Sequence, residues 1–169
     1  WNHIEEKHVY GYKIHTIVDT KNELPVTLSI TKANVHDSKE FQNLYSKTIS
    51  YKTRFSTRFY IGDKAFDTTI IRKTLLKDEI RPIIKVAKTR IEPQYPSWFL
   101  NKYVKRVAVE RFFSRLKNYL DLKKLGIYGK KNVFLYTYFI CIGMLIIGYI
   151  NQCLGYSPRS IKTFFRKFT

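Results

Sequence analysis

Hydrophobic and polar positions alternate in two short segments near the start of the chain. These segments are residues 11–18 and 24–30, and the polar residues 19–22 lie between them. Alternation with a period of two is typical of half-buried strands, and a short polar turn between two such segments is typical of a hairpin. The pattern therefore predicts an antiparallel β-hairpin. We expect Lys13 and His15 on its outward face, with His15 at the surface or facing phosphate, because no second histidine lies at metal-ligand spacing.

Farther along, apolar positions switch between helical and strand-like spacing. Phe41, Leu44 and Tyr45 recur at helical intervals. Short apolar segments next to turn residues predict strands, and the charged, proline-containing stretch 88–96 predicts a loop. The elements expected after the hairpin are a helix from 37 or 38 to about 50, a strand at 58–61, a helix from 67 or 68 to about 77, a strand at 81–86 and a long helix at about 100–122.

The most apolar part of the chain is residues 133–150, which include no charged side chain. Eighteen such residues reach the lower limit for a membrane-spanning helix, and a helix buried in a protein core has the same composition. We favour the buried helix, because the segment contains Thr137, three tyrosines and two glycines and follows a highly charged stretch.

The order of these elements is that of one α/β domain with a mixed sheet, joined by both hairpin and crossover connections. A chain of 169 residues with 44% apolar residues can fill a single core. We assign residues 1–152 to this domain and residues 153–169 to a basic aromatic tail. The chain opens with Trp1 rather than Met, so we expect that it is part of a longer protein.

The charge of the chain narrows the choice of partners. Thirty-one Lys and Arg residues against 13 Asp and Glu give a formal net charge of +18. Such a balance is typical of proteins that bind polyphosphates, so nucleic acid is the first partner to consider; anionic lipid is the alternative. Two cysteines, both in the apolar C-terminal stretch, indicate neither a disulfide framework nor a paired metal-ligand motif, which favours a reducing cytosol.

Candidate chemistry lies on the long helix. Tyr103, Arg106, Glu110 and Lys117 are spaced by three, four and seven residues. In a regular helix all four project within an arc of roughly 60°, as one polar stripe. By itself, Glu110 with an arginine four residues before it is an ordinary weak surface pair. The apolar residues expected to face the core beside the stripe are Val109, Phe113, Leu116 and Leu120.

The spacing Y-x2-R-x3-E-x6-K resembles the signature of a large group of DDE-type insertion-sequence transposases. Further segments of that family's catalytic domain occur in the same order, so the resemblance covers about residues 10–152. These segments are GYKIH at 11–15, NVHDS at 34–38, YIGDKAFD at 60–67 and VERFFSRLK at 109–117.

The resemblance implies a ribonuclease-H-like fold, an α/β mixed sheet flanked by helices, whose first central strand is missing from this chain. It makes Asp63 the second catalytic carboxylate and Glu110 the third, both as ligands of two Mg²⁺ or Mn²⁺ ions. Asp63 would follow a strand and Glu110 would lie on a helix, and hard cations take oxygen ligands from several segments in this way. The family's first catalytic Asp precedes the GYKIH segment, where residues 1–10 contain none. We therefore expect little or no strand cleavage from this polypeptide alone.

The remaining stripe residues, Tyr103, Arg106 and Lys117, are expected to contact DNA phosphates, and Lys123 and Lys124 extend this basic surface. The resemblance implies double-stranded DNA as partner, both transposon ends and target, and a homodimer assembled on it. We expect the protein in the cytoplasm, associated with the nucleoid, and no membrane partner.

Two other function classes compete with a DNA transposase that cleaves element ends and transfers strands. One is a non-catalytic DNA-binding remnant of a decayed transposase, which the missing first Asp favours. The other is a membrane-associated basic protein, which rests on residues 133–150. Salt-sensitive binding to duplex DNA without lipid would count against the second of these.

Overall fold

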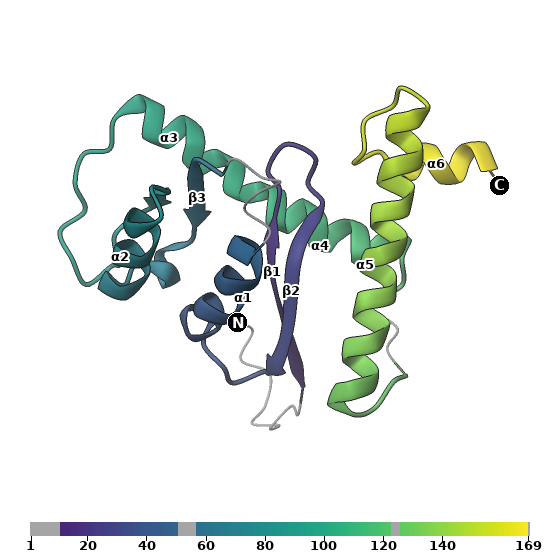
Figure 1. The fold of residues 1–169 in the computed structure, drawn as a ribbon, viewed down its shortest axis with the longest axis horizontal. Coiled ribbons are helices and arrows are strands. Elements are labelled where there is room, and N and C mark those ends of the chain that lie inside the picture. Colours follow the sequence, from purple (N-terminus) through teal and green to yellow (C-terminus); the bar gives the residue numbers. More distant parts are fainter. Residues whose placement is uncertain (1–10, 51–56, 123–125, 169) are drawn as a thin grey trace.

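The computed structural model of the chain describes residues 11–50, 57–122 and 126–168 (Figure 1). In chain order, its elements are strands β1 (Tyr12–Val18) and β2 (Pro25–Lys32), helix α1 (Asp37–Ser50), strand β3 (Phe59–Gly62), the 3-10 turn η2 (Lys64–Phe66), helix α2 (Thr69–Lys77), strand β4 (Arg81–Ile84), helix α3 (Ser97–Tyr103), the 3-10 turn η3 (Val104–Arg106), and helices α4 (Val107–Tyr119), α5 (Lys130–Cys153) and α6 (Ile161–Phe168).

The predicted hairpin is confirmed. Strands β1 and β2 pair antiparallel, with Tyr12 opposite Lys32 and Thr16 opposite Leu28. The side chain of Asp19 organises the turn, because its carboxylate accepts the backbone N–H groups of Lys21 and Asn22, each at 3.0 Å. The short polar turn seen in the sequence therefore has a direct structural cause.

Strands β3 and β4 form a second sheet, parallel and two-stranded, with Ile61 opposite Ile83. Helix α2 connects them and begins as predicted: the hydroxyl of Thr68 caps it by accepting the N–H of Ile71 at 3.2 Å. Strand β4 ends at Ile84, two residues earlier than expected. Apolar side chains from α1, α2, β4 and the turn before β4 form the core of this half, namely Phe41, Tyr45, Ile71, Leu75, Ile80 and Ile84.

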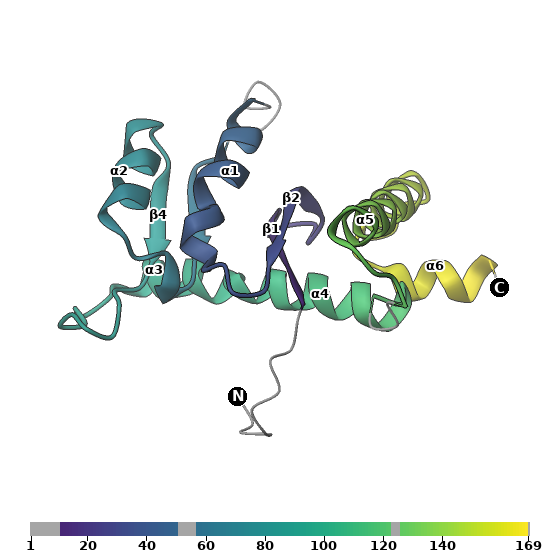
Figure 2. The same ribbon diagram turned by 90° about the horizontal axis from the view of Figure 1, so that it is seen from below.

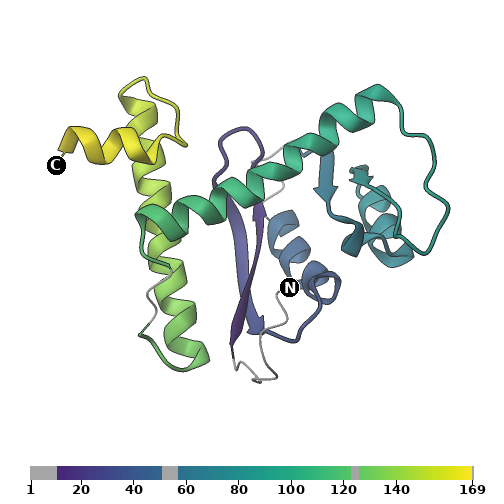
Figure 3. The same cartoon turned by 180° about the vertical axis from the view of Figure 1, so that it is seen from behind.

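The two sheets lie apart, with α1 between the hairpin and α2–β4 (Figures 1 and 2). Helix α5 lies on the far side of the hairpin, while α3 and α4 run across these layers as one rod (Figures 2 and 3). In the described residues, each sheet has two strands. This mixed α/β architecture of small sheets flanked by helices agrees with the expected ribonuclease-H-like fold.

The long helix differs from the expectation in its start and its regularity. It begins at Ser97, and the 3-10 turn η3 separates α3 from α4, which ends at Tyr119. Its buried face is centred on Ala108, Phe112 and Leu116, because the hairpin and helices α5 and α6 cover that side. Of the four residues expected to face the core, Leu116 is fully buried, whereas Val109, Phe113 and Leu120 are only partly buried at the border of this cluster.

Helix α5 is buried along one face only, whereas the sequence analysis favoured a helix buried in the core. One face packs against β2 and α6, with Val133, Thr137 and Met144 in the core. The opposite face is exposed. In the most apolar 18-residue window of the whole helix, 33% of the residues are buried. By length and composition alone this helix could cross a membrane. After α5, helix α6 anchors the end of the chain through Ile161, which is 1% exposed.

A buried carboxylate fastens the loop after β4 to helix α2. Asp67, whose side chain is fully buried, accepts Arg72 Nε at 2.7 Å and the N–H of Ala87 at 2.8 Å, and lies 3.4 Å from Arg90 Nη1. Burial alone would raise its pKa, but the N–H of Ala87 and the guanidinium of Arg72 outweigh burial and hold the pKa below its usual value.

Replacing Asp67 with Asn is therefore expected to lower the free energy of unfolding at neutral pH by about 2 kcal/mol. This is less than the loss of a fully buried ion pair would cost, because both arginines are partly exposed to solvent. Because the folded-state pKa is depressed, this contribution is present above pH 3.8 and is lost as the pH falls through the folded-state value. Urea unfolding at pH 7 and pH 3 measures both effects. Equal stability of the variant at pH 7 would contradict the assignment.

Candidate active site

Asp63 immediately follows the end of β3, as the sequence predicts. Its side chain is exposed, and its carboxylate accepts the N–H of Lys64 at 2.7 Å, which caps the 3-10 turn η2. This single backbone contact leaves oxygen lone pairs available, because a carboxylate can accept about four hydrogen bonds. The sharp turn after the strand thus presents a carboxylate to solvent.

Tyr103, the last residue of α3, lies against Asp63. Burial raises the pKa of its phenol, and the negative charge of Asp63 and a hydrogen bond to that carboxylate raise it further. The phenol therefore stays protonated at neutral pH and donates to Asp63. The guanidinium of Arg106 stands over the same ring, with its carbon 5.9 Å from the ring centroid.

Arg106 in turn contacts Glu110. Its Nη1 atom lies 2.9 Å from Glu110 Oε1, and the Glu110 side chain is 58% exposed. Three of the four residues in the predicted stripe, Tyr103, Arg106 and Glu110, are therefore neighbours, and Tyr103 lies beside Asp63. Such an exposed pair contributes less than about 1 kcal/mol, so Glu110 can exchange Arg106 for another cation at little cost.

The other predicted site residues are less closely joined. Lys117 is exposed on α4, two turns or about 10 Å along the axis from Glu110. Lys123 and Lys124 lie outside the described residues. Within residues 11–50, 57–122 and 126–168, no three His, Cys, Asp or Glu side chains gather into a metal site. In this part of the chain, Asp63 and Glu110 therefore do not belong to a group of three such side chains.

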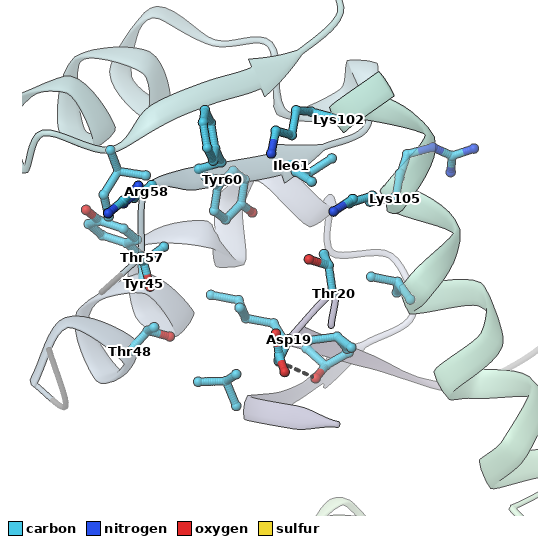
Figure 4. A pocket seen from close by; sticks show the side chains of 18 of the residues that line it. Asp19, Thr20, Tyr45, Thr48, Thr57, Arg58, Tyr60, Ile61, Lys102 and Lys105 are labelled. Carbon is cyan, nitrogen blue, oxygen red and sulfur yellow. Dashed lines mark hydrogen bonds between the residues drawn. The ribbon is translucent and has the colours of Figure 1, made fainter. Parts of the chain in front are cut away.

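A cavity of about 600 Å³ separates the two sheets (Figure 4). Residues 16–18 of β1 and 59–61 of β3 form opposite walls, and α1 forms another. On the remaining side, Arg106 and Val109 line it next to Glu110, whereas Asp63 and Glu110 themselves stand outside its lining.

Basic side chains that the sequence analysis did not single out face this cavity. The amino groups of Lys102 and Lys105 point into it from the α3–η3 segment, and Arg58 lines it beside β3 (Figure 4). Lys102 Nζ lies 4.8 Å from the centroid of the Phe59 ring. A signal for them was available in the sequence: Lys102 lies three residues before Lys105 and four before Arg106, and residues at these intervals share a helix face.

The prediction that His15 lies on the outward, exposed face of the hairpin is wrong. His15 is 6% exposed; its Nε2 lies 2.7 Å from Thr31 Oγ1 and its Nδ1 lies 3.1 Å from Asp37 Oδ1. Burial lowers its pKa more than the carboxylate of Asp37 raises it, so the ring is neutral at neutral pH. The strand's outer face is covered because α1 begins at Asp37, directly against it.

A comparison with protein-family models identifies the family that this geometry suggests. The model of the transposase DDE domain matches residues 1–146. This range contains both predicted carboxylates, the hairpin, the parallel pair and most of α5. Neither the comparison with curated proteins nor that with solved structures finds a match.

Proposed function

Because this chain belongs to the transposase DDE domain family, we propose that it carries the second and third catalytic carboxylates of an insertion-sequence transposase. The proposed reaction is divalent-metal-dependent cleavage of phosphodiester bonds at the element ends, followed by strand transfer. The observation that supports it most is the placement of Tyr103 and Arg106 between the two carboxylates: Tyr103 lies beside Asp63, and Arg106 pairs with Glu110 at 2.9 Å.

Asp63 and Glu110 fit a site for Mg²⁺ or Mn²⁺. Both are exposed carboxylates, and these ions prefer oxygen ligands. Two such ions, when bound, would stabilise the charge that develops on the attacking and leaving oxygens of the phosphodiester. The family's first catalytic carboxylate, which it carries on its first strand, would complete the set.

The chain's own side chains prepare this site. Tyr103 donates to Asp63 and fixes the direction of its carboxylate, and the pairing of Arg106 with Glu110 keeps both exposed charges compensated. When Glu110 turns to another cation, the guanidinium of Arg106 is released. It can then form a bidentate contact with a DNA phosphate, which its planar geometry favours.

We propose that DNA follows the basic side of the α3–η3–α4 rod. Tyr103, Arg106 and Lys117 supply phosphate contacts, and Lys123 and Lys124 extend them. Lys102 and Lys105 add two amino groups at the mouth of the cavity. Contacts of this kind position a duplex without reading its sequence, so binding should weaken steeply with salt. Transposon ends and target DNA are the proposed partners, in a nucleoid-associated complex with a second copy of the protein.

Replacing Tyr103 with Phe is expected to lower the rate of cleavage about tenfold, to weaken DNA binding only slightly because one of several phosphate contacts is lost, and to leave folding unchanged. The reason is the loss of one hydrogen bond to a charged carboxylate, worth about 1.5 kcal/mol. Single-turnover nicking rates measure the effect, and Tyr119→Phe, an exposed tyrosine at the end of α4, is the matched control. Equal rates for wild type and Tyr103→Phe would show that Asp63 needs no such orientation.

The proposed function is tested with the full-length gene product and a labelled duplex that carries an end of its element. We expect nicking with Mg²⁺ or Mn²⁺ and none with EDTA, while salt-sensitive DNA binding persists in both. Binding without nicking under all metal conditions would favour the competing function, a DNA-binding remnant that cannot cut. That alternative rests on the lack of an Asp among residues 1–10, before the GYKIH segment.

A further inference from the structure

Helix α5 has a second apolar face that nothing in the described structure covers. Six large apolar residues on this face are 42% to 70% exposed: Leu135, Phe139, Ile142, Leu145, Ile146 and Tyr149. The opposite face, with Val133, Thr137 and Met144, is buried in the protein core. A surface helix normally carries polar residues on its outer side, so a helix that is apolar on both sides is suited to burial on both.

The exposed residues follow the spacing of a helix–helix seam. We define the α5 seam as Leu135, Phe139, Ile142, Ile146, Tyr149 and Cys153, whose intervals alternate between four and three residues. This is the heptad spacing by which two helices pack against each other along their length. No charged residue occurs between positions 133 and 150, so nothing on the seam opposes burial. This spacing suits another helix as the partner.

We propose that the α5 seam binds the α5 seam of a second copy of this chain. The exposed apolar residues of this face, Leu145 included, offer on the order of 700 Å² of surface. This is close to the roughly 800 Å² that each partner contributes to a standard stable interface. A symmetric pair closes the interface, because the same surface is buried on both copies. The proposal specifies the surface of the dimer proposed above, and its test contains no DNA.

The charges at the helix ends select an antiparallel pair. Lys130 and Lys131 stand at the N-terminal end of α5, and its last turn has no basic residue. A parallel pair would bring four lysines together, whereas an antiparallel pair separates the two groups by about 36 Å, the length of the helix. The helix dipoles also favour the antiparallel arrangement. Within it, Ile142 faces Ile146 of the second copy, Phe139 faces Tyr149, and Leu135 faces Cys153.

A membrane is a poorer occupant for this face. The other side of α5 packs on strand β2 and helix α6. It also carries polar side chains that form hydrogen bonds with carbonyl groups of the protein itself. The amide of Asn151, 1% exposed, donates to the carbonyl of Ser160 at 3.2 Å, and the buried hydroxyl of Thr137 donates to Val133 O at 2.7 Å. A lipid bilayer would surround the whole helix, which this packing prevents.

Sedimentation of the full chain without DNA tests the proposal, with Ile146→Lys placing a charge at the centre of the seam. We expect a wild-type dimer, at least a 100-fold weaker dimer for Ile146→Lys, and a wild-type dimer for Ile70→Lys. Ile70 is 74% exposed on α2, and circular dichroism checks that each variant is folded. A folded wild-type monomer at all concentrations, partition of that monomer into lipid vesicles, or a dimer unaffected by Ile146→Lys would overturn the proposal.

Cross-linking tests the orientation independently. The structure leaves Cys153 exposed and Cys141 buried. In an antiparallel pair, Leu135→Cys brings a new thiol opposite Cys153 of the other copy, within reach of a disulfide. We expect covalent dimers of this variant under mild oxidation and none of wild type. Covalent wild-type dimers through Cys153 would show a parallel pair, and absence of dimers from Leu135→Cys would overturn the register. Because DNA cleavage is not measured, this result is independent of the proposed activity.

Discussion

Replacing Asp63 with Asn, or Glu110 with Gln, is expected to reduce metal-dependent nicking by the full-length gene product more than about 100-fold. Changes to groups that merely support a metal ligand typically cost 10- to 100-fold, and we propose that these two carboxylates are ligands themselves. Single-turnover nicking of an end duplex measures the loss. Both substitutions preserve side-chain size, so they remove charge without leaving a cavity.

The controls for these variants separate catalysis from folding and binding. Glu79→Gln and Asp121→Asn remove exposed carboxylates elsewhere and should cut at the wild-type rate. DNA affinity of Asp63→Asn and Glu110→Gln should stay equal or rise slightly, because each removes negative charge near the phosphates. If both variants cut as fast as wild type, the contacts from Asp63 to Glu110 are structural and the DNA-binding remnant becomes the better account.

Replacing Glu23 with Gln is expected to lower the free energy of unfolding by about 3 kcal/mol at neutral pH. Glu23 is 2% exposed and contacts three arginines from two distant segments. Arg111 Nη1 lies 3.0 Å and Arg159 Nη1 lies 3.3 Å from its carboxylate, and Arg115 binds both the carboxylate and, at 2.9 Å, the backbone carbonyl. Loss of a buried charge typically costs 3 to 5 kcal/mol, and the exposure of Arg111 and Arg159 reduces this.

The same cluster gives a pH dependence. Burial alone would raise the pKa of Glu23, but the hydrogen bonds and charges of Arg115 and Arg111 outweigh it and lower the pKa below 4.5. The stabilisation is therefore complete above pH 4.5 and is lost as the pH falls through the folded-state value. Urea unfolding should show the difference from wild type shrinking below pH 4. Glu110→Gln, which loses only an exposed pair, should unfold near wild type; an equally small effect for Glu23→Gln would contradict this account.

The elements that could be predicted from the sequence are those set by local signals. Alternation on both sides of Asp19 gave the hairpin, and Thr68 gave the start of α2. The position of Asp63 followed from the strand before it. Each of these features depends on residues within about ten positions, where periodicity and capping act.

The features that were missed depend on distant partners. His15 is buried because Asp37, 22 positions away, begins a helix over it, and Glu23 is paired with Arg159, 136 positions away. Neither pairing has a local signal in the sequence. The 3-10 turn η3 likewise falls within a segment whose apolar spacing is helical throughout. In α5, composition indicated burial but could not show that one face would be covered and the other left open.

The central claim is that Asp63 binds the divalent ion that supports cleavage, and a change of metal preference tests it most directly. In Asp63→Cys the carboxylate is replaced by a thiolate, which is a poorer ligand for Mg²⁺ than for the softer Mn²⁺. We predict that the ratio of nicking rates in Mn²⁺ and Mg²⁺ rises at least tenfold above the wild-type ratio. An unchanged ratio, with Asp63→Cys still cutting in Mg²⁺, would show that Asp63 does not touch the metal.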